Sequence, residues 1–241
     1  MERLEIHTIA IMSTIVHIET STDVCSVALS QDGHCIFHQE NREGHSHARV
    51  LAPFVEDAVS MADSHAIPLD AVAVSSGPGS YTGLRIGVST AKGLCYGRNL
   101  KLISVPTLKL ICVPVLLYRE DLPADALLCP MIDARRMEVY TAVYDRSLHT
   151  VAETSPQIIT PESFRDLLDK QPVVFMGNGA AKCKGTITHP NAIFLDDVEP
   201  LAKNMVPLAE RELMNGEVED TAYFEPFYLK EFVAGQPKKL F

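Results

Sequence analysis

Three short apolar runs separated by turn residues restrict how the first part of the chain can fold. They cover residues 15–18, 25–29 and 34–39, with turn residues at 20–23 and 31–33, and this pattern predicts three strands joined as a meander. Further elements are expected at 46–64 (helix), 71–75 (strand), 84–96 (helix), 102–105 (strand) and 107–118 (helix). This order of strands and helices forms half of a mixed-sheet α/β protein.

The second part of the chain also mixes strands with helices. Pro123 marks a linker between the two parts. Beyond it the sequence predicts strands at 126–132, 138–144 and 172–176, a helix opened by residues 160–162, and an amphipathic helix at 201–214. We find no short-period repeat and no low-complexity segment.

Charge and composition exclude several classes of protein. The chain has 241 residues, of which 46% are hydrophobic, so it can bury a sizeable core in one large domain or two small ones. The formal net charge is -10, with 31 acidic against 21 basic residues, which argues against a chain that holds RNA or DNA by itself. The six cysteines form no CxxC pair, so we expect reduced thiols rather than a zinc ribbon or a disulfide framework.

The sequence also bears on location. No apolar run approaches the ~20 residues that cross a bilayer. Glu2, Glu5 and His7 interrupt the first residues, so this stretch does not resemble a signal peptide. We therefore expect a cytoplasmic protein with no membrane contact.

The glycine-rich stretch SSGPGSYTGLRIGVSTAKGL matches none of the common motifs of phosphate binding or acyl transfer. A Walker loop requires a lysine directly after its second glycine, and no lysine follows Gly83. Gly77, Gly79 and Gly83 read GxGxxxG, one residue longer than the dinucleotide fingerprint, and Pro78 removes an amide donor. Ser80 lies in no GxSxG elbow, which argues against a serine hydrolase. We expect Gly77 and Gly79 to shape a tight turn between strand and helix.

Small residues recur every four positions in the helix that follows this turn. They would form a flat side of the helix that a helix of a second chain can approach closely. The alternative is that this side packs against the chain's own sheet. With two apolar residues of the preceding helix, the expected partner interface comprises Val50, Phe54, Gly83, Leu84, Gly87, Val88, Ala91 and Cys95.

Four motifs together resemble one family. IETSTDVCSVAL, GPGSYTGLRIG, IDARRMEVY and EPFYLKEF occur in the order found in the bacterial TsaB proteins, formerly grouped with glycoproteases. The resemblance extends over nearly the whole chain, from Ile15 to about Lys239. The resemblance implies an α/β fold of the actin-like, sugar-kinase-like (ASKHA) type, with two related subdomains of mixed sheets flanked by helices. It divides the chain into an extension at 1–11, an N-terminal subdomain at 12–121 with the partner-binding helices, and a C-terminal subdomain at 122–241.

The resemblance also implies a function. TsaB proteins are noncatalytic partners of TsaD and, with TsaE, support attachment of a threonylcarbamoyl group to the tRNA adenosine next to the anticodon. We then expect no tightly bound cofactor, with ATP or ADP only at the interface of the complex, and tRNA contacted only through the complex. The partner surface is also a candidate for a homodimer of the isolated chain. The alternative is an active glycoprotease-like metallopeptidase or an ATP-binding enzyme of the actin-like fold.

Two features bear on that alternative. Active TsaD relatives hold a metal with an HxxxH pair on the first helix, whereas the matching segment here reads HxH at His45 and His47, which would point to different sides of a helix. We therefore expect no metal site and no catalytic residue. Thr20, Ser21 and Thr22 are candidates to bind a phosphate in the first turn, but this turn lacks the glycine that allows close approach, and ordinary turn hydrogen bonds are the alternative.

Asp133 ends a predicted strand in the IDAR motif. Arg135 and Arg136 follow it directly, so a charge partner is at hand. We expect a structural ion pair or a turn anchor there.

Overall fold

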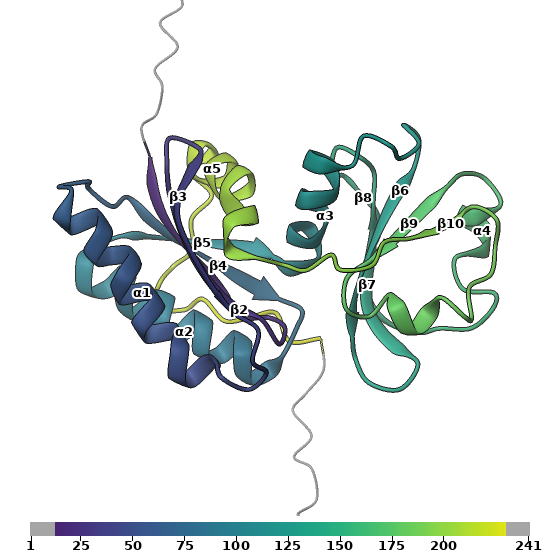
Figure 1. The fold of residues 1–241 in the computed structure, drawn as a ribbon, viewed down its shortest axis with the longest axis horizontal. Coiled ribbons are helices and arrows are strands. Elements are labelled where there is room, and N and C mark those ends of the chain that lie inside the picture. The colour runs from purple at the N-terminus through teal and green to yellow at the C-terminus, as the bar shows by residue number, and fades with distance from the viewer. Residues whose placement is uncertain (1–12, 230–241) are drawn as a thin grey trace, which may run out of the picture. The chain divides into compact units, whose positions relative to one another are not determined.

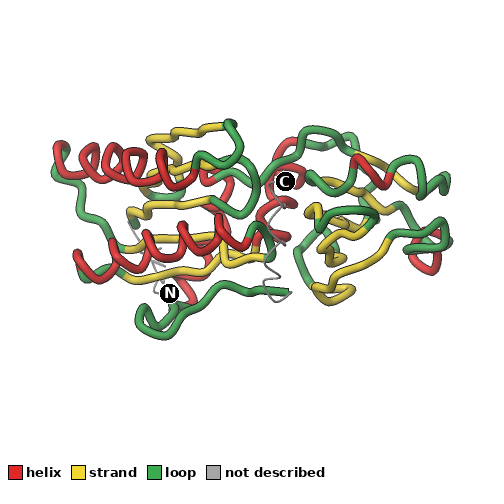
Figure 2. The backbone as a smooth tube through the Cα atoms, turned by 90° about the horizontal axis from the view of Figure 1, so that it is seen from below, coloured by secondary structure: helices red, strands yellow, loops and turns green. Residues whose placement is uncertain are grey.

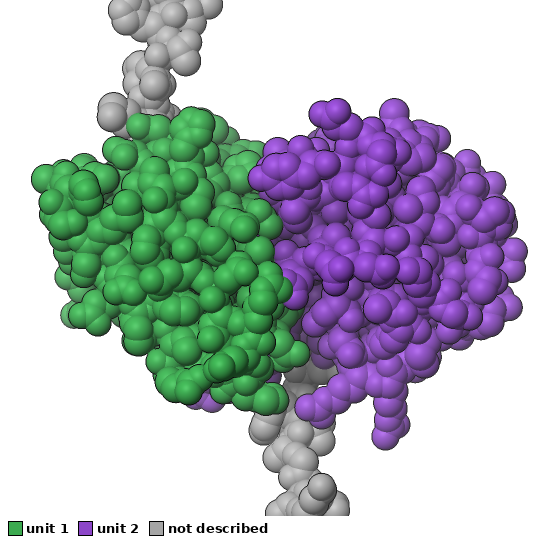
Figure 3. All heavy atoms as spheres, in the orientation of Figure 1, with its two compact units in different colours: residues 1–75, 86–105, 200–224 green, residues 76–85, 106–199, 225–241 purple. Residues whose placement is uncertain are grey.

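The computed structural model describes residues 13–229, which form two compact units (Figure 1 and Figure 3). The first unit comprises the residues up to 75 together with 86–105 and 200–224, and the second comprises 76–85, 106–199 and the residues from 225 onward. The expected extension at 1–11 and the end of the EPFYLKEF motif lie outside the described residues. Among residues 13–229, no helix has the length and apolar character needed to span a membrane.

The first sheet is built on the expected meander. Its strands are β1 (Thr14–Glu19), β2 (Cys25–Gln31), β3 (His34–Asn41), β4 (Ala71–Gly77) and β5 (Lys101–Pro106), in the order β3-β2-β1-β4-β5. β1 pairs with β2, and β2 with β3, in antiparallel fashion, which confirms the meander. β4 pairs with β1 in parallel, which requires a crossover, and α1 (His47–Ser64) supplies it.

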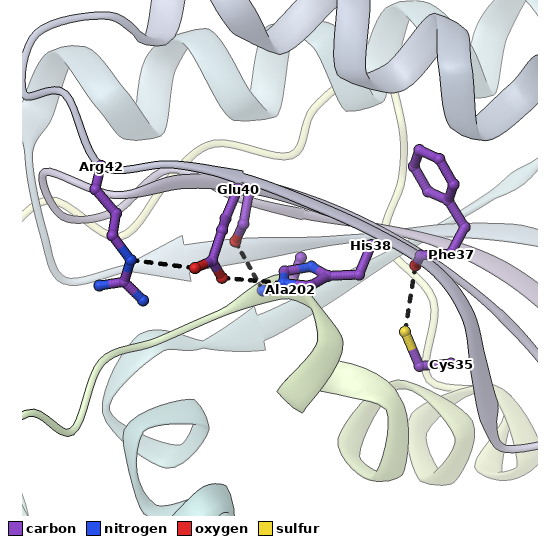
Figure 4. Close-up of polar contacts among 7 residues, drawn as sticks. Cys35, Phe37, His38, Glu40, Arg42 and Ala202 are labelled. Carbon is purple, nitrogen blue, oxygen red and sulfur yellow. Dashed lines mark hydrogen bonds and ion pairs between the residues drawn. The ribbon is translucent and has the colours of Figure 1, made fainter.

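Helices cover both faces of the first sheet (Figure 1). Side chains alternate along a strand, so Val16 and Ile18 pack under α1 and α2 (Tyr81–Arg98), which lie along the same strands in Figure 2. Ile15 and His17 face the opposite side, where η2 (Ala202–Met205) and α5 (Val206–Asn215) pack. Ser26 Oγ accepts the amide N–H of Ala202 at 2.9 Å and holds η2 on this face (Figure 4).

The outer strand β3 carries charged side chains. His38 Nε2 lies 2.9 Å from Glu40 Oε2, and Arg42 Nε donates to Glu40 Oε1 at 3.1 Å (Figure 4). Partial burial would raise the pKa of Glu40, but the hydrogen bonds from His38 and Arg42 outweigh it and lower this pKa. Charged side chains on an edge strand discourage pairing with a strand of another chain.

The second sheet repeats the connectivity of the first. Its strands are β6 (Leu127–Asp133), β7 (Glu138–Tyr144), β8 (Thr150–Ile158), β9 (Val173–Met176) and β10 (Ala192–Phe194), in the order β10-β9-β6-β7-β8. β6 is antiparallel to β7, β7 is antiparallel to β8, and β6 is parallel to β9, as β1, β2, β3 and β4 are in the first sheet. The shared strand order confirms the expectation of two related subdomains.

Aromatic packing forms the centre of the second unit. Phe175 on β9 is fully buried, and its ring centroid lies 5.4 Å from that of Phe164 and 5.0 Å from that of Phe194. α3 (Thr107–Tyr118) has the expected bounds and packs against β6.

The division of the chain differs from the single expected boundary between residues 121 and 122. Residues 76–85 belong to the second unit, and 200–224 return to the first. The return is fixed by the hydrogen bond from Ala202 to Ser26 and by one from the Ser13 hydroxyl to Glu210. Helical periodicity at 201–214 indicates that one face of the segment is buried, but it does not indicate which sheet buries it.

Several elements also differ from the prediction. α2 begins at Tyr81 rather than near residue 84, because Ser80 caps it: its Oγ accepts the Gly83 N–H at 3.2 Å. The helix expected after residue 160 is only α4 (Arg165–Leu168), since Phe164 adopts φ 63° and interrupts it. Strands β8 and β10 were not predicted from the sequence.

Candidate functional site

The β1–β2 turn buries the three residues that the sequence marks as phosphate candidates. Thr20, Ser21 and Thr22 are 0%, 1% and 8% exposed. The Ser21 N–H donates to Glu19 Oε1 at 2.6 Å, and the Ser21 hydroxyl donates to the same oxygen. The Thr20 N–H points to Ser75 Oγ at 3.4 Å. The amides of Thr20 and Ser21 are therefore directed to side chains of the chain itself.

Two ionisable side chains of β1 are fully buried. Burial raises the pKa of Glu19 to about 7, against the effect of hydrogen bonds with Ser21 and Ser75. Burial lowers the pKa of His17 to about 3, and its Nε2 lies 2.7 Å from Ser30 Oγ. His17 is thus uncharged at neutral pH, whereas Glu19 titrates there. Glu19 was not predicted as a site residue from the sequence, although a glutamate directly before a turn of hydroxyl residues was the available signal.

The stripe of small residues on α2 faces into the chain, which corrects most of the expected partner interface. Six of its residues are buried: Gly83, Leu84, Gly87, Val88, Ala91 and Cys95. A Cβ atom on Gly87 would lie 2.2 Å from Thr20 Oγ1, so glycine is what allows α2 to lie directly on the β1–β2 turn. These residues are packing positions of the chain itself, the alternative that the sequence left open.

A second stripe on α2 is less buried, with Gly93 and Gly97 exposed and Ile86 and Thr90 half-buried. Ile86, Thr90, Gly93 and Gly97 follow one another at helical spacing, and a Cβ atom on Gly93 or Gly97 would meet no atom within 4 Å. Val50 and Phe54 of α1 are half-buried at the margin of the same apolar cluster. The outer α1–α2 face is defined here by these six residues. It keeps Val50 and Phe54 of the expected interface, leaves out the six buried residues of α2, and adds four others from the same helix.

An ion pair ties the far ends of these two helices together. Arg98 Nη1 and Nη2 donate to the two carboxylate oxygens of Asp63 at 2.8 and 2.6 Å. The hydrogen bonds from Arg98 lower the pKa of Asp63. A two-bond contact of this kind fixes the relative direction of α1 and α2 at their C-terminal ends.

The two histidines of the HxH segment lie at the start of α1. His45 precedes the helix with φ 62° and is exposed, whereas His47 is the first helical residue and is buried. They therefore differ in both backbone conformation and burial. Within residues 13–229, no three His, Cys, Asp or Glu side chains are grouped so as to hold a metal ion.

Asp133 anchors the β6–β7 turn. Its Oδ1 accepts a hydrogen bond from the backbone N–H of Arg135 at 2.7 Å and one from Lys182 Nζ at 2.5 Å. The charge partner of Asp133 is thus Lys182, and Arg135 contributes its amide. Gly179 allows this close packing, because a Cβ atom there would lie 2.8 Å from the carbonyl carbon of Ile132.

The glycine turn after β4 contacts the EPFYLKEF motif. The Phe227 N–H donates to Ser76 O at 2.7 Å, and the rings of Tyr81 and Tyr228 lie 4.8 Å apart between centroids. Gly77 has φ 107°, as expected for this turn, and a Cβ atom there would lie 2.7 Å from Phe227 O. Two of the four family motifs therefore meet in the second unit.

Two mixed sheets with one shared strand order, each flanked by helices, define a protein of the actin-like (ASKHA) fold class. The turn after the first strand of its N-terminal sheet carries hydroxyl residues and no glycine.

Comparison with known proteins agrees with this class. Residues 41–237 match the family model "TsaD: tRNA N6-adenosine threonylcarbamoyltransferase". The chain is 31% identical over 232 residues to "tRNA threonylcarbamoyladenosine biosynthesis protein TsaB" of Escherichia coli (strain K12), covering 91% of this chain and 96% of that protein. It is 28% identical over 230 residues to the protein of the same name from Haemophilus influenzae, covering 91% and 94%. The chain belongs to the TsaB family.

Solved structures share the fold. One is YeaZ from Pseudomonas aeruginosa, 25% identical, with a TM-score of 0.72 over 90% of this chain and 100% of that one. Another, also from Pseudomonas aeruginosa and described as similar to peptidase YEAZ, is 24% identical with a TM-score of 0.75 over 91% and 100%.

Proposed function

We propose that this chain is a noncatalytic subunit in the biosynthesis of threonylcarbamoyladenosine in tRNA, and that it acts in a complex with a TsaD-type subunit. The relatives carry this biosynthetic role in their names, and the matching family model is described by the transferase reaction. The net charge of -10 argues against direct binding of tRNA by this chain. The tRNA would therefore be bound through the complex, in the cytoplasm.

The outer α1–α2 face is the observation that supports pairing. A Cβ atom on Gly93 or Gly97 would meet no atom within 4 Å, and a partner helix can approach such a surface closely. Apolar residues at its margin would lose contact with water on binding. The same face suits a twofold pair of identical chains when the partner is missing. TsaE would then join the assembled complex.

The proposal assigns no catalytic residue to this chain. His45 and His47 differ in burial, and Thr20 and Ser21 are enclosed by the chain itself. We place any ATP or ADP at the interface with the partner rather than on this chain alone. The alternative, a metallopeptidase or ATP-binding enzyme, predicts activity from the purified chain without a partner.

One substitution tests the pairing. Gly93→Leu adds a side chain to the outer α1–α2 face at a position where a Cβ atom would meet no atom within 4 Å. We therefore expect affinity for the TsaD-type subunit of the same organism to fall at least about tenfold. The melting temperature should stay equal or rise, because leucine favours a helix more than glycine does. Gly185→Leu is the matched control, since Gly185 is also exposed with open space around it.

Copurification and a threonylcarbamoyl-transfer assay, each with and without this chain, provide the readouts. Wild-type affinity of Gly93→Leu would remove the outer α1–α2 face from the proposal. Transfer activity that is unchanged when this chain is omitted would contradict the proposed function itself.

A further inference from the structure

The β1–β2 turn already holds an acidic group. The Glu19 side chain is fully buried, and its Oε1 accepts both the N–H and the O–H of Ser21. Backbone N–H groups that converge in a turn form a concave site for phosphates and other anions. We propose that the Glu19 carboxyl occupies the position that a bound anion would take in this turn, so that the turn binds no phosphate, whether free or carried by a nucleotide.

Helix packing leaves no space for a second anion. Thr20 and Ser21 are buried, and α2 lies so close to the turn that a Cβ atom on Gly87 would come within 2.2 Å of Thr20 Oγ1. Within residues 13–229, Thr20 Oγ1 has no hydrogen-bond partner, and it lies against this glycine. A phosphate could reach the hydroxyl only if α2 moved away from the sheet.

The length of its side chain explains why a glutamate can fill this position. The carboxyl of Glu19 folds back to the amide of the residue two positions later, at 2.6 Å. A phosphate placed on the same amide would compete with the Glu19 carboxyl for the donors. Above about pH 7, where this carboxyl is ionised, its charge would also repel the phosphate. The side chain thus excludes phosphate by occupancy at any pH, and by electrostatics as well above about pH 7.

Removing the carboxyl should expose the anion site. Glu19→Ala leaves the Ser21 donors and a space the size of a carboxylate, so added formate should bind there and raise the melting temperature of the variant. Wild type and Glu19→Gln should show no such rise, because their side chains fill the space. We expect formate to bind Glu19→Ala at least about tenfold more tightly than wild type, with chloride at the same ionic strength as the control.

A measurement on the wild-type chain keeps the inference testable if Glu19→Ala does not fold. Inorganic phosphate and tripolyphosphate are titrated while the amide resonances of Ser21 and Thr22 are followed by NMR. We expect these resonances to stay unchanged. A saturable shift of these resonances would overturn the inference. So would a folded Glu19→Ala variant whose melting temperature formate does not raise. Neither experiment needs a partner chain, so failure here would leave the proposed pairing untouched.

Discussion

Gly87 is the residue at which one added carbon decides how α2 packs. Gly87→Ala would place its Cβ atom 2.2 Å from Thr20 Oγ1 and 3.3 Å from Thr20 Cβ. Both sites are buried, so we expect overpacking to lower the free energy of unfolding by about 1–3 kcal/mol. Urea unfolding followed by circular dichroism measures this change.

Two further variants separate overpacking from other causes. Adding Thr20→Ala to Gly87→Ala removes the contacting oxygen, so the double variant should be more stable than the sum of the single effects predicts. Gly93→Ala in the same helix meets no atom within 4 Å and should raise stability by about 1 kcal/mol. Simple additivity at Thr20 and Gly87 would contradict the close contact.

Glu19 should make the stability of the chain depend on pH near neutrality. Its folded-state pKa of about 7 lies above the ordinary value of 4.5, so the folded chain holds the proton more tightly than the unfolded chain. This contribution is full below the ordinary value and is lost as the pH rises through about 7. Glu19→Gln cannot ionise. Its free energy of unfolding should therefore rise relative to that of wild type by up to about 3 kcal/mol as the pH increases from about 5 to about 8.

The comparison of the two chains isolates Glu19. His17 has its pKa lowered to about 3 and changes stability only as the pH falls from its ordinary value of 6.5, equally in wild type and Glu19→Gln. Its effect cancels in the difference. Parallel unfolding curves for the two chains across this range would show that Glu19 is ionised when folded.

Sequence patterns located the β1–β2 turn but not the atom that matters most in it. Thr20, Ser21 and Thr22 stood out as hydroxyl residues in a glycine-free turn, and all three are buried there. The hydrogen bond from Ser21 back to Glu19 depends on side-chain conformation, which residue type alone does not specify.

At the scale of elements, α2 shows what periodicity can and cannot predict. Its helical character was clear, and so was a stripe of small residues. The sequence holds two such stripes, one through Gly87 and one through Gly93, and only the packing of α2 on the sheet distinguishes the buried stripe from the less buried one. The sequence therefore predicted a side of small residues on α2, but it did not indicate which stripe the chain itself buries.

Strands were predicted where burial leaves a pattern and missed where it does not. β1, β2 and β7 carry apolar runs and were found within a few residues. β8 is a partly exposed outer strand with Pro156 inside it, and β10 has only three residues, so neither shows a clear apolar alternation.

At the scale of the whole molecule, the chain forms two sheets of the same strand order, but the first unit includes a segment that follows the second sheet in sequence. The segment with η2 and α5 follows the second sheet in sequence and packs on the first through Ala202 and Ser26. His17 and Ser30 lie on the face of the first sheet that η2 covers. The last helices in the sequence therefore cover buried polar groups of the first strands. Folding of the first unit should therefore depend on residues that come almost two hundred positions later.

Hydrogen exchange can test this assignment in the intact chain. Gly87→Ala destabilises the first unit, and Phe175→Ala removes the central ring of the second, at a cost of about 3–5 kcal/mol. If α5 unfolds with the first sheet, its amides should exchange faster in Gly87→Ala, together with those of β1 and β2, while the amides of β6 and β9 change less. In Phe175→Ala the order should reverse. Faster exchange of α5 in step with β6 and β9 would place this helix in the second cooperative unit, because amides that open together belong to one packed body.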